Sequence, residues 1–434
     1  MRMIEDEDVE FIRLQFTDLH GTLKNLAVTA SQFERIIDNG CLFDISSVDA
    51  VADATRSERM LVPDYSTFEI FPWRPQQGKV ARLLCTICLP DGTISKGDPR
   101  SILKGVTDEA AKDGYSFEVG PECEFFLFET DEHAKPTVIT HEQAGYFDIG
   151  PLDEGENARR DIVLTLEDMG FEIAASHHEA APAQHEIDLM HDEANVIADK
   201  LQTFKLAVRT MAKRHGLHAT FMPKPKNDEK GSAMHINISM FKDGKNIFCD
   251  ESDENRISQE GYYFIGGLLK HMPAITAVTN PLVNSYKRLV PEYAPVYMAW
   301  SSINRNQMIR IPVTRNPRNT RIELRNPDSS CNPYLALALC LAAGMDGIKN
   351  KIQPPAAIDE DISAMSHAKR KELGIKRVPR TLSDALEVFE NDEFVRTILG
   401  DYAVDKYVEA KKKEWDDYNR FVSQWELNEY LIKY

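Results

Sequence analysis

Three charged side chains in the segment 320–328 have the spacing of a site that binds both a cation and anions. On a β-strand, Arg321, Glu323 and Arg325 would point to one side, with Ile322 and Leu324 on the other. A carboxylate can bind a metal ion, and guanidinium groups beside it can bind phosphate or a substrate carboxylate. The alternative is a ladder of ion pairs on a sheet face, so the interpretation depends on whether other segments carry the same chemistry.

Two further segments carry pairs of carboxylates. Glu122 and Glu124 stand two residues apart before an apolar run, so they would share one face of a strand. Their repulsion and the cost of their burial would be relieved by a divalent cation, whereas a solvent-facing strand edge is the alternative. Glu179 and Glu186 flank a turn that contains Pro182, and they can therefore converge from the two sides of a bend.

A fourth segment adds an imidazole. His235, Asn237 and Ser239 alternate with apolar residues, so a polar face would stand opposite an apolar one. A lone histidine in such a strand is more often a core residue than a metal ligand. With two further polar side chains on the same face, the pattern favours a ligand role for His235 at least as much as a core role. Oxygen donors with one imidazole favour Mg²⁺ or Mn²⁺ over zinc, although two further histidines precede Glu179.

Arginines complete the set of chemically active residues. Arg288, Arg305 and Arg310 join the two arginines of the first segment. Five glutamates, one histidine and five arginines on inward faces describe a two-metal site with an anion-binding wall, which is the architecture of phosphoryl transfer. The sequence has neither a glycine-rich P-loop nor a set of kinase motifs, so a nucleotide would be held by metals and arginines.

The elements that position these residues fall into two parts. The first part predicts strands at 11–16, 23–28, 66–72 and 79–89 and a helix at 30–39, which suits a small α+β domain. Asp98 as N-cap and Pro99 at the first helical position begin a helix that ends near residue 113. Beyond it, strands alternate with helices expected near 158–169, 194–215, 259–278, 333–349, 383–391 and 402–422. We expect an α+β protein with domains at 1–97 and 98–434.

Bulk properties exclude several classes of function. A net charge of −18 over 434 residues argues against a nucleic-acid partner, because neutralising phosphates needs a basic surface. No apolar run reaches the ~18–20 residues of a membrane helix, and the acidic start of the sequence is unlike a signal peptide. Seven scattered cysteines indicate reduced thiols in a cytoplasm, and the lone CxxC of Cys85 and Cys88 is interpreted as structural.

These segments, in this order, resemble the glutamine synthetase family, in the short type I form that lacks the adenylylation insert. The resemblance covers essentially the whole chain and rests on the motifs QFTD (15–18), KGDPR (96–100), GYFD (145–148), FMPKP (221–225), NSYKRLVP (284–291), CNPY (331–334) and WEL (425–427). It implies a β-grasp-like N-terminal domain and a catalytic domain with a curved antiparallel sheet flanked by helices. It also implies a dodecamer of two stacked hexameric rings, with active sites shared between subunits. The WEL motif at 425–427 is consistent with a C-terminal tail that docks on another subunit.

The resemblance assigns a role to each residue by position. Two metal ions, Mg²⁺ or Mn²⁺, would be held, one by Glu124, Glu179 and Glu186 and the other by Glu122, His235 and Glu323. Glutamate would bind at Gly231, Arg288, Arg305 and Arg325. ATP, the co-substrate, would bind at Asn237, Ser239, Arg305, Arg310, Arg318 and Arg321. Asp44, Ser47, Arg305 and Glu292 would act in catalysis, in which the γ-carboxylate of glutamate attacks ATP and ammonia then displaces phosphate from γ-glutamyl phosphate.

The sequence departs from the family pattern on the ammonia side. The loop from Asp44 lacks two glycines, Asp53 replaces a basic residue used in feedback inhibition by some relatives, and Lys230 replaces an asparagine beside Gly231. The active-site flap reads Pro-Glu-Tyr-Ala-Pro (291–295), one residue shorter than the usual Pro-Gly-Tyr-Glu-Ala-Pro. Three functions follow: glutamine synthetase, a γ-glutamyl-amine ligase that uses methylamine, ethanolamine or a polyamine, or a weakly active regulatory paralogue.

Overall fold

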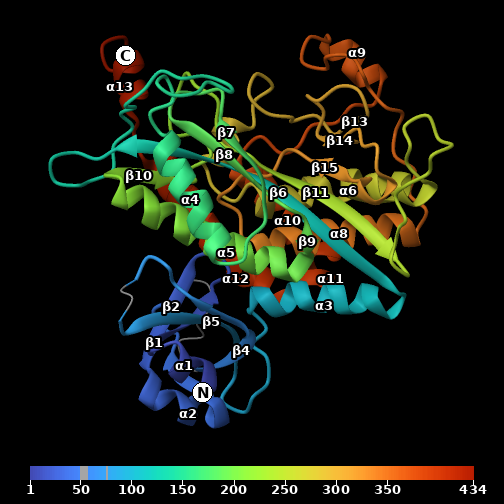
Figure 1. Ribbon diagram of the computed structural model, residues 1–434. Coiled ribbons are helices and arrows are strands. Elements are labelled where there is room, and N and C mark those ends of the chain that lie inside the picture. Colours follow the sequence, from blue (N-terminus) through green and yellow to red (C-terminus); the bar gives the residue numbers. More distant parts are fainter. Residues whose placement is uncertain (49–56, 75–76) are drawn as a thin grey trace.

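The N-terminal part of the chain folds around a small mixed sheet. The computed structural model describes residues 1–48, 57–74 and 77–434, and Figure 1 shows this part below the rest of the molecule. The strand order is β2-β1-β5-β4-β3, in which β1 and β5 are parallel and the other neighbours are antiparallel. The elements are α1 (Arg2–Asp6), β1 (Val9–Thr17), β2 (Leu23–Thr29), α2 (Ala30–Asn39), β3 (Cys41–Asp44), β4 (Glu58–Ile70) and β5 (Lys79–Cys88). The expected β-grasp arrangement is confirmed.

Strand β4 is longer than the sequence pattern predicted. It begins at Glu58 rather than near residue 66, and Pro63 lies inside it opposite Cys85. A proline within a strand removes a ladder hydrogen bond and so argues against a strand, but the pairing of β4 with β5 changes register just beyond it, between Asp64 and Glu69. Strand β3 pairs with β4 only from Glu58 to Leu61, so among the described residues Pro63 has one neighbouring strand rather than two.

The larger part of the chain is organised by a second sheet. Its main path runs β13-β14-β15-β11-β6-β8-β7, with β9 and β10 paired to β6 and β12 paired to β11, and all pairs except β13 with β14 are antiparallel. The strands are β6 (Tyr115–Glu129), β7 (Ile173–His178), β8 (Gln184–Leu189), β9 (Asp192–Glu193), β10 (Leu217–Thr220), β11 (Met234–Lys242), β12 (Lys245–Asn246), β13 (Trp300–Ser301), β14 (Ile309–Arg310) and β15 (Ile322–Leu324). The expected curved, mainly antiparallel sheet with flanking helices is confirmed.

Long helices cover one face of this sheet, and the loops that carry the charged motifs lie on the other (Figure 1). The helices are α3 (Pro99–Lys112), α4 (Glu156–Asp168), α5 (Ala194–Arg214), α6 (Gln259–Thr279), α7 (Ser285–Arg288), α8 (Pro333–Lys349), α9 (His367–Glu372), α10 (Leu382–Glu390), α11 (Glu393–Leu399), α12 (Asp401–Arg420) and α13 (Gln424–Tyr430), with a 3₁₀ turn at Pro317–Asn319. Asp98 caps α3 as expected, accepting a hydrogen bond from the Ser101 amide.

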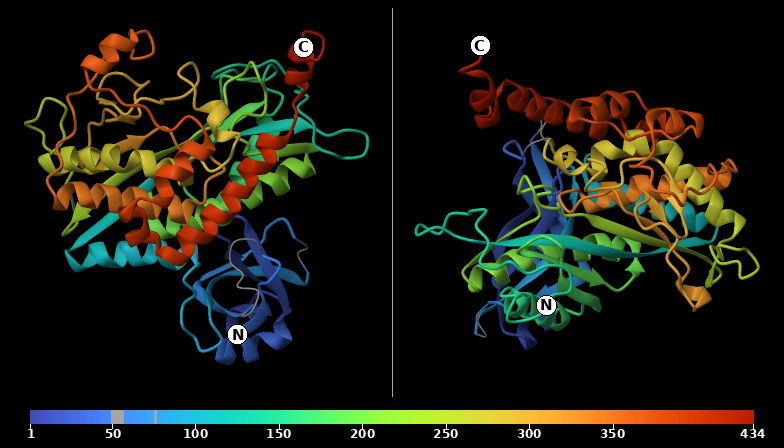
Figure 2. Two further views of the ribbon diagram at one scale, coloured as in Figure 1. Left: turned by 180° about the vertical axis from the view of Figure 1, so that it is seen from behind. Right: turned by 90° about the horizontal axis from the view of Figure 1, so that it is seen from above.

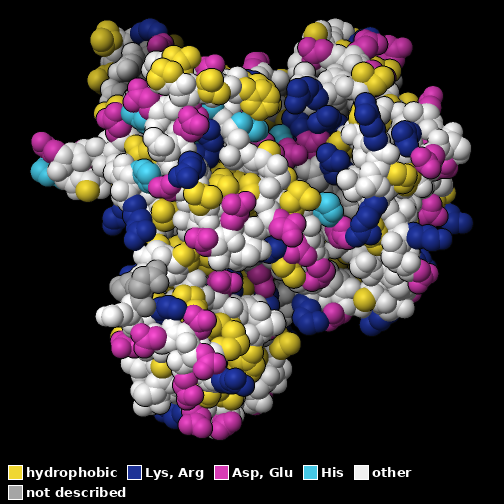
Figure 3. All heavy atoms as spheres, viewed as in Figure 1, with side chains coloured by type: hydrophobic (Ala, Val, Ile, Leu, Met, Phe, Trp, Pro, Cys, Tyr) yellow, Lys and Arg dark blue, Asp and Glu magenta, His cyan; other side chains and the backbone are white. Residues whose placement is uncertain are grey.

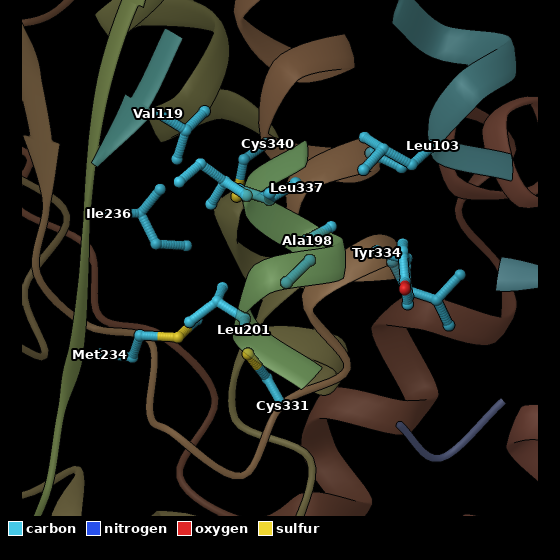
Figure 4. Packing of buried hydrophobic residues seen from close by; sticks show 14 of the residues in the cluster. Leu103, Val119, Ala198, Leu201, Met234, Ile236, Cys331, Tyr334, Leu337 and Cys340 are labelled. Carbon is cyan, nitrogen blue, oxygen red and sulfur yellow. The ribbon is translucent and has the colours of Figure 1, made fainter. Parts of the chain in front are cut away.

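The core explains how β11 presents its polar residues. Figure 4 shows Met234 and Ile236 of β11 pointing toward Leu201 of α5 and Leu337 of α8, and all four side chains are buried. Because alternate residues of a strand point to opposite faces, packing Met234 and Ile236 against the helices directs the intervening residues to the other face.

The C-terminal segment differs from the sequence expectation. Helix α12 crosses the rear of the molecule in Figure 2 and is followed by α13, where only a tail beyond the last long helix was expected. A capping box between Ser423 and Glu426 explains this helix, since each residue satisfies a free amide of the first turn. Within the described ranges, no helix is both long and apolar enough to cross a bilayer.

Candidate active site

A pocket of about 860 Å³ opens on the face of the large sheet opposite the helices. Its walls come from β6, β8, β11, the turn between β7 and β8, and the loop segments around residues 230, 291–297 and 305–310. Eleven of the residues singled out in the sequence line it: Glu122, Glu124, Glu179, Glu186, Gly231, His235, Arg288, Glu292, Arg305, Arg310 and Arg325. Figure 3 shows basic, acidic and histidine side chains close together over this upper part of the molecule.

One half of the pocket holds carboxylates that are paired with positive partners. His235 Nδ1 lies 2.9 Å from Glu122 Oε2 and 3.6 Å from Glu323 Oε1. Burial acts to raise the pKa of Glu122, but hydrogen bonds with His235 and Asn237 and the charge of Arg325 outweigh it and lower that pKa to about 2. The register explains the contact, because His235 on β11 pairs with Glu122 on β6 and Asn237 pairs with Glu323 on β15.

Glu323 is the most enclosed of these carboxylates. Its side chain is 1% exposed, and it accepts a hydrogen bond from Arg310 Nη1 at 3.1 Å and another, shorter one from Arg325 Nη1. The regular strand around it is only three residues long, shorter than the segment 320–328 suggested. Arg321 nevertheless lies on the same face, donating to Asn237 Oδ1 at 3.0 Å.

The other half of the pocket gathers carboxyl groups that raise one another's pKa values. Burial, together with the charges of Glu124 and Glu179, raises the pKa of Glu186 well above its usual range. Burial and the neighbouring Glu186 raise the pKa of Asp188 to about 9. Burial and Glu124 also raise the pKa of Glu179. Carboxyl groups gathered in this way are stabilised as anions only if a cation joins them.

The donor sets fit divalent metal ions. The ligand atoms of Glu122, His235 and Glu323 lie within 4.8 Å of one another, and so do those of His177, Glu186 and Asp188. Carboxylate oxygens with one imidazole per group suit Mg²⁺ or Mn²⁺, and none of the described cysteines lines the pocket.

Part of the predicted nucleotide site lies beside the pocket rather than in its lining. Ser239 is buried and donates its hydroxyl to the Thr320 carbonyl at 3.0 Å. Arg318 forms a 2.7 Å ion pair with Glu118 at the surface. Arg321 and Asn237 bind each other beside the pocket. None of these four is among the residues that line the pocket in the described part of the chain.

Asp44 and Ser47 lie in the N-terminal domain, and neither lines this pocket among the residues described. Hydrogen bonds from the Ser46 hydroxyl and amide lower the pKa of Asp44, so this exposed carboxylate stays ionised at neutral pH. Asp53 and the rest of segment 49–56 fall outside the described residues.

The active-site flap at 291–295 is held against the pocket. Lys224 Nζ lies 3.8 Å from the centre of the Tyr293 ring, which is a cation–π contact, and Ala294 is buried. Glu292 lines the pocket from this segment.

Two residues that line the pocket, Asp188 and His177, were not predicted from the sequence. Asp188 stands two residues after Glu186 on β8, and His177 Nε2 lies 3.5 Å from Glu186 Oε1. The i, i+2 spacing of Glu186 and Asp188 was the available signal, since it repeats the spacing of Glu122 and Glu124.

Comparison with known proteins agrees with this geometry. The glutamine synthetase catalytic-domain family matches residues 96–430, and the glutamine synthetase β-grasp domain matches residues 8–90. Proteins described as glutamine synthetase are 54% identical in Clostridium saccharobutylicum (100% of this chain, 98% of the relative) and 50% identical in Methanosarcina mazei (99% and 96%). A glutamine synthetase of Staphylococcus aureus is 48% identical over 100% of this chain and 97% of its own.

Solved structures resemble the whole chain. A structure described as a GmaS/ADP complex superposes with a TM-score of 0.89 at 30% identity and covers 99% of both chains. The Plasmodium falciparum glutamine synthetase superposes with a TM-score of 0.87 at 26% identity, covering 98% of this chain and 96% of its own. With matches along its full length in sequence and fold, the chain belongs to the glutamine synthetase family, in the short type I-like form.

Proposed function

We propose that this chain is a glutamine synthetase, an ATP-dependent ligase that joins ammonia to the γ-carboxylate of glutamate. The observation that carries the proposal is the convergence of paired carboxylates, an imidazole and arginines in one pocket, in a chain about 50% identical to glutamine synthetases over its full length. A carboxylate must become a better electrophile before an amine can attack it, and a phosphoryl group turns its oxygen into a leaving group.

Two divalent ions would be held, one by Glu122, His235 and Glu323 and the other by Glu124, Glu179 and Glu186. Of the second set, Glu186 also belongs to the group that it forms with His177 and Asp188. Ions bound there would neutralise phosphate oxygens and orient the transferred group. Mg²⁺ and Mn²⁺ both suit these ligands.

The arginines would position the two anionic substrates against each other. Arg288, Arg305 and Arg325 are proposed to bind glutamate, and the buried Nε of Arg325 has no partner among the described residues, so it is available as a donor. Arg310, like Arg325, donates a hydrogen bond to Glu323. The residues proposed to bind ATP are Arg305, Arg310, Arg318, Arg321, Asn237 and Ser239. Gly231 is also proposed to bind glutamate; packing excludes a side chain at this position, because a Cβ would lie 2.1 Å from the Pro223 carbonyl oxygen.

The first step forms a bond between the γ-carboxylate oxygen and the γ-phosphorus of ATP and breaks the bond to ADP. The second forms a C–N bond to ammonia, releases phosphate and leaves a proton on a base. Asp44 and Ser47 of a neighbouring subunit, with Glu292, are proposed to bind and deprotonate ammonium, so the site is proposed to be complete only in a ring. We therefore propose a dodecamer of two hexameric rings, in which each subunit has domains at 1–97 and 98–434. The enzyme would act in nitrogen metabolism in the cytoplasm, a reducing compartment that suits its seven free cysteines.

The test is an amine panel. Purified protein with ATP, glutamate and Mg²⁺ or Mn²⁺ is offered ammonium, methylamine, ethanolamine, putrescine or spermine, and the γ-glutamyl product is identified by mass spectrometry. Glutamine as the preferred product supports the proposal. Preference for a larger amine would make the chain a γ-glutamyl-amine ligase, and ATP binding without product from any amine would make it a regulatory paralogue.

A further inference from the structure

A second cluster of ionisable side chains is buried behind the acidic half of the pocket. It consists of Glu142, from the loop after β6, together with His178, His185, Arg159 and Asp153. The side chains of Glu142 and His178 are fully buried. Ligand atoms of Glu142, His178 and His185 lie within 4.8 Å of one another, which raises the question of a third metal site.

The hydrogen bonds of His185 argue against a metal ion in this cluster. His185 Nδ1 lies 2.8 Å from Arg159 Nη1, and a guanidinium can only donate. The Nδ1 atom is therefore the acceptor, which places the ring proton on Nε2. A protonated ring nitrogen cannot bind a metal ion, so this set does not offer three ligands.

Glu142 instead ties together the two ends of the turn between β7 and β8. Its Oε1 accepts hydrogen bonds from His178 Nε2, at the start of the turn, and from the Ala183 amide at 2.6 Å, at its end. Its Oε2 accepts a 2.9 Å hydrogen bond from the Glu154 amide. Ala183 has φ +62°, in the left-handed region that residues with a Cβ rarely adopt, so the carboxylate stabilises a strained turn.

The same turn carries the acidic side of the pocket. His178 Nδ1 donates to the Glu179 carbonyl at 2.6 Å, so the bond to Glu142 continues into the backbone of Glu179. Gln184, which follows Ala183, donates at 2.9 Å to Glu124 Oε2 and at 3.1 Å to the Gly231 carbonyl. One end of the turn therefore fixes the backbone of Glu179, and the other end places Gln184 against the carboxylate of Glu124, both of the same proposed metal site.

We propose that Glu142 is a positioning residue for the metal site of Glu124, Glu179 and Glu186, acting through the His178 side chain and the Ala183 amide. The inference rests on the proposed function, because that function assigns metal ions to the pocket. Groups that orient metal ligands commonly change metal affinity 10- to 100-fold when they are replaced. Glu142 is suited to that role because all three of its partners are donors, so a neutral amide cannot satisfy them all.

The test measures metal binding directly on the full-length protein, by electron paramagnetic resonance of free Mn²⁺ during a titration. Glu142→Gln is expected to weaken one class of Mn²⁺ sites about tenfold or more and to leave the other class unchanged. Glu142→Asp keeps the charge on a shorter side chain, so its Mn²⁺ affinity is expected to lie between those of Glu142→Gln and the unaltered protein. It replaces Glu142→Gln in the test if that variant does not fold. Glu132→Gln is the matched control, since its side chain is 86% exposed in the same loop.

A second measurement separates positioning from loss of folded protein. In Glu142→Gln, kcat is expected to recover at saturating Mn²⁺, whereas a merely structural defect would lower kcat at every Mn²⁺ concentration. Unchanged Mn²⁺ affinity in both Glu142 variants, or a kcat that excess Mn²⁺ does not restore, would overturn the inference. If the unaltered protein binds no Mn²⁺, the proposed metal site itself is refuted. If it binds Mn²⁺ and the Glu142 variants bind equally well, only the role of Glu142 is refuted.

Discussion

At the scale of single residues, Glu323 is the point where the two kinds of chemistry in the pocket meet. It contacts Arg310 and Arg325 through hydrogen bonds and lies 3.6 Å from His235, all while nearly free of solvent. Two guanidinium groups stabilise this buried carboxylate through charge-assisted hydrogen bonds, and it can share a metal ion with Glu122 through its remaining lone pairs.

Glu323→Gln is therefore expected to lower kcat about 100-fold or more with every amine, because a metal ion supplies several kcal/mol of charge stabilisation and ~1.4 kcal/mol corresponds to a decade. The amide keeps the volume of the side chain, so size-exclusion chromatography is expected to show unchanged assembly. Glu129→Gln, at the end of β6, is the control and should retain activity. Full turnover of Glu323→Gln would refute the metal assignment.

At the scale of elements, the N-terminus of α3 carries a buried acid with a measurable pH signature. Burial raises the pKa of Asp98 to about 6, although hydrogen bonds from Ser101 and the charge of Arg100 oppose the shift. A carboxyl whose folded pKa lies above its unfolded value of ~3.9 stabilises the fold below pH ~4 and loses that stabilisation as the pH rises through about 6.

Asp98→Asn keeps a capping oxygen but cannot ionise. Relative to this variant, the unaltered protein is expected to lose roughly 2 kcal/mol of unfolding free energy between pH 4 and pH 7, at ~1.4 kcal/mol per pKa unit. Denaturant titrations of both proteins at each pH and equal concentration give this difference. A difference that stays flat with pH would show that Asp98 ionises at its ordinary pKa.

The short flap at 291–295 is the element that bears on the choice of amine. Restoring Pro-Gly-Tyr-Glu-Ala-Pro places a carboxylate after Tyr293, and a charge-assisted hydrogen bond to ammonium contributes ~1.5–3 kcal/mol. The ratio of kcat/KM for ammonium over methylamine is expected to rise about 10- to 100-fold. A flap of equal length with Gln in place of Glu is the control. Equal ratios for the two flaps would mean that Glu292 of the native flap already binds ammonium.

At the scale of the whole molecule, the sequence predicted the long helices well, but it predicted only part of the set of residues that meet in the pocket. The long helices begin and end within about two residues of the expected positions because their apolar spacing, Asp98 and the glycine stops are local signals. The two- and three-residue strands β13 to β15 are too short to show a full periodic pattern, and they form by pairing in series, β15 on β11, β14 on β15 and β13 on β14. His177 escaped prediction because it meets Glu186 across two paired strands, whereas Asp188 shares the strand of Glu186 and could have been predicted from its i, i+2 spacing. Among the described residues, Asp44 does not line the pocket of its own chain.

The junction between the N-terminal sheet and the catalytic part depends on Arg100. Its guanidinium donates to Asp64 Oδ2 of β4 at 2.7 Å and to Asp199 of α5 at 2.8–3.2 Å, and Asp199 also accepts from Tyr334 at 2.7 Å. Arg100 is 19% exposed and Asp199 12%, so these pairs are weakly screened by water.

Arg100→Ala is expected to weaken the attachment of the N-terminal sheet by about 3 kcal/mol, because removing one partner leaves buried charge unpaired. Denaturation followed by circular dichroism should change from one cooperative transition to two, with the N-terminal sheet unfolding first, and proteolysis should begin between residues 89 and 97. Lys104→Ala removes an exposed pair on the same helix, whose side chains are 64% and 60% exposed, and it should change stability by less than ~1 kcal/mol.

Since the proposed ammonium site needs Asp44 from a neighbouring subunit, a loosened N-terminal sheet should also raise the KM for ammonium while leaving ATP binding intact. Two variants with the same stability and the same KM would show that the apolar contacts, rather than the ion pairs, hold the two parts together.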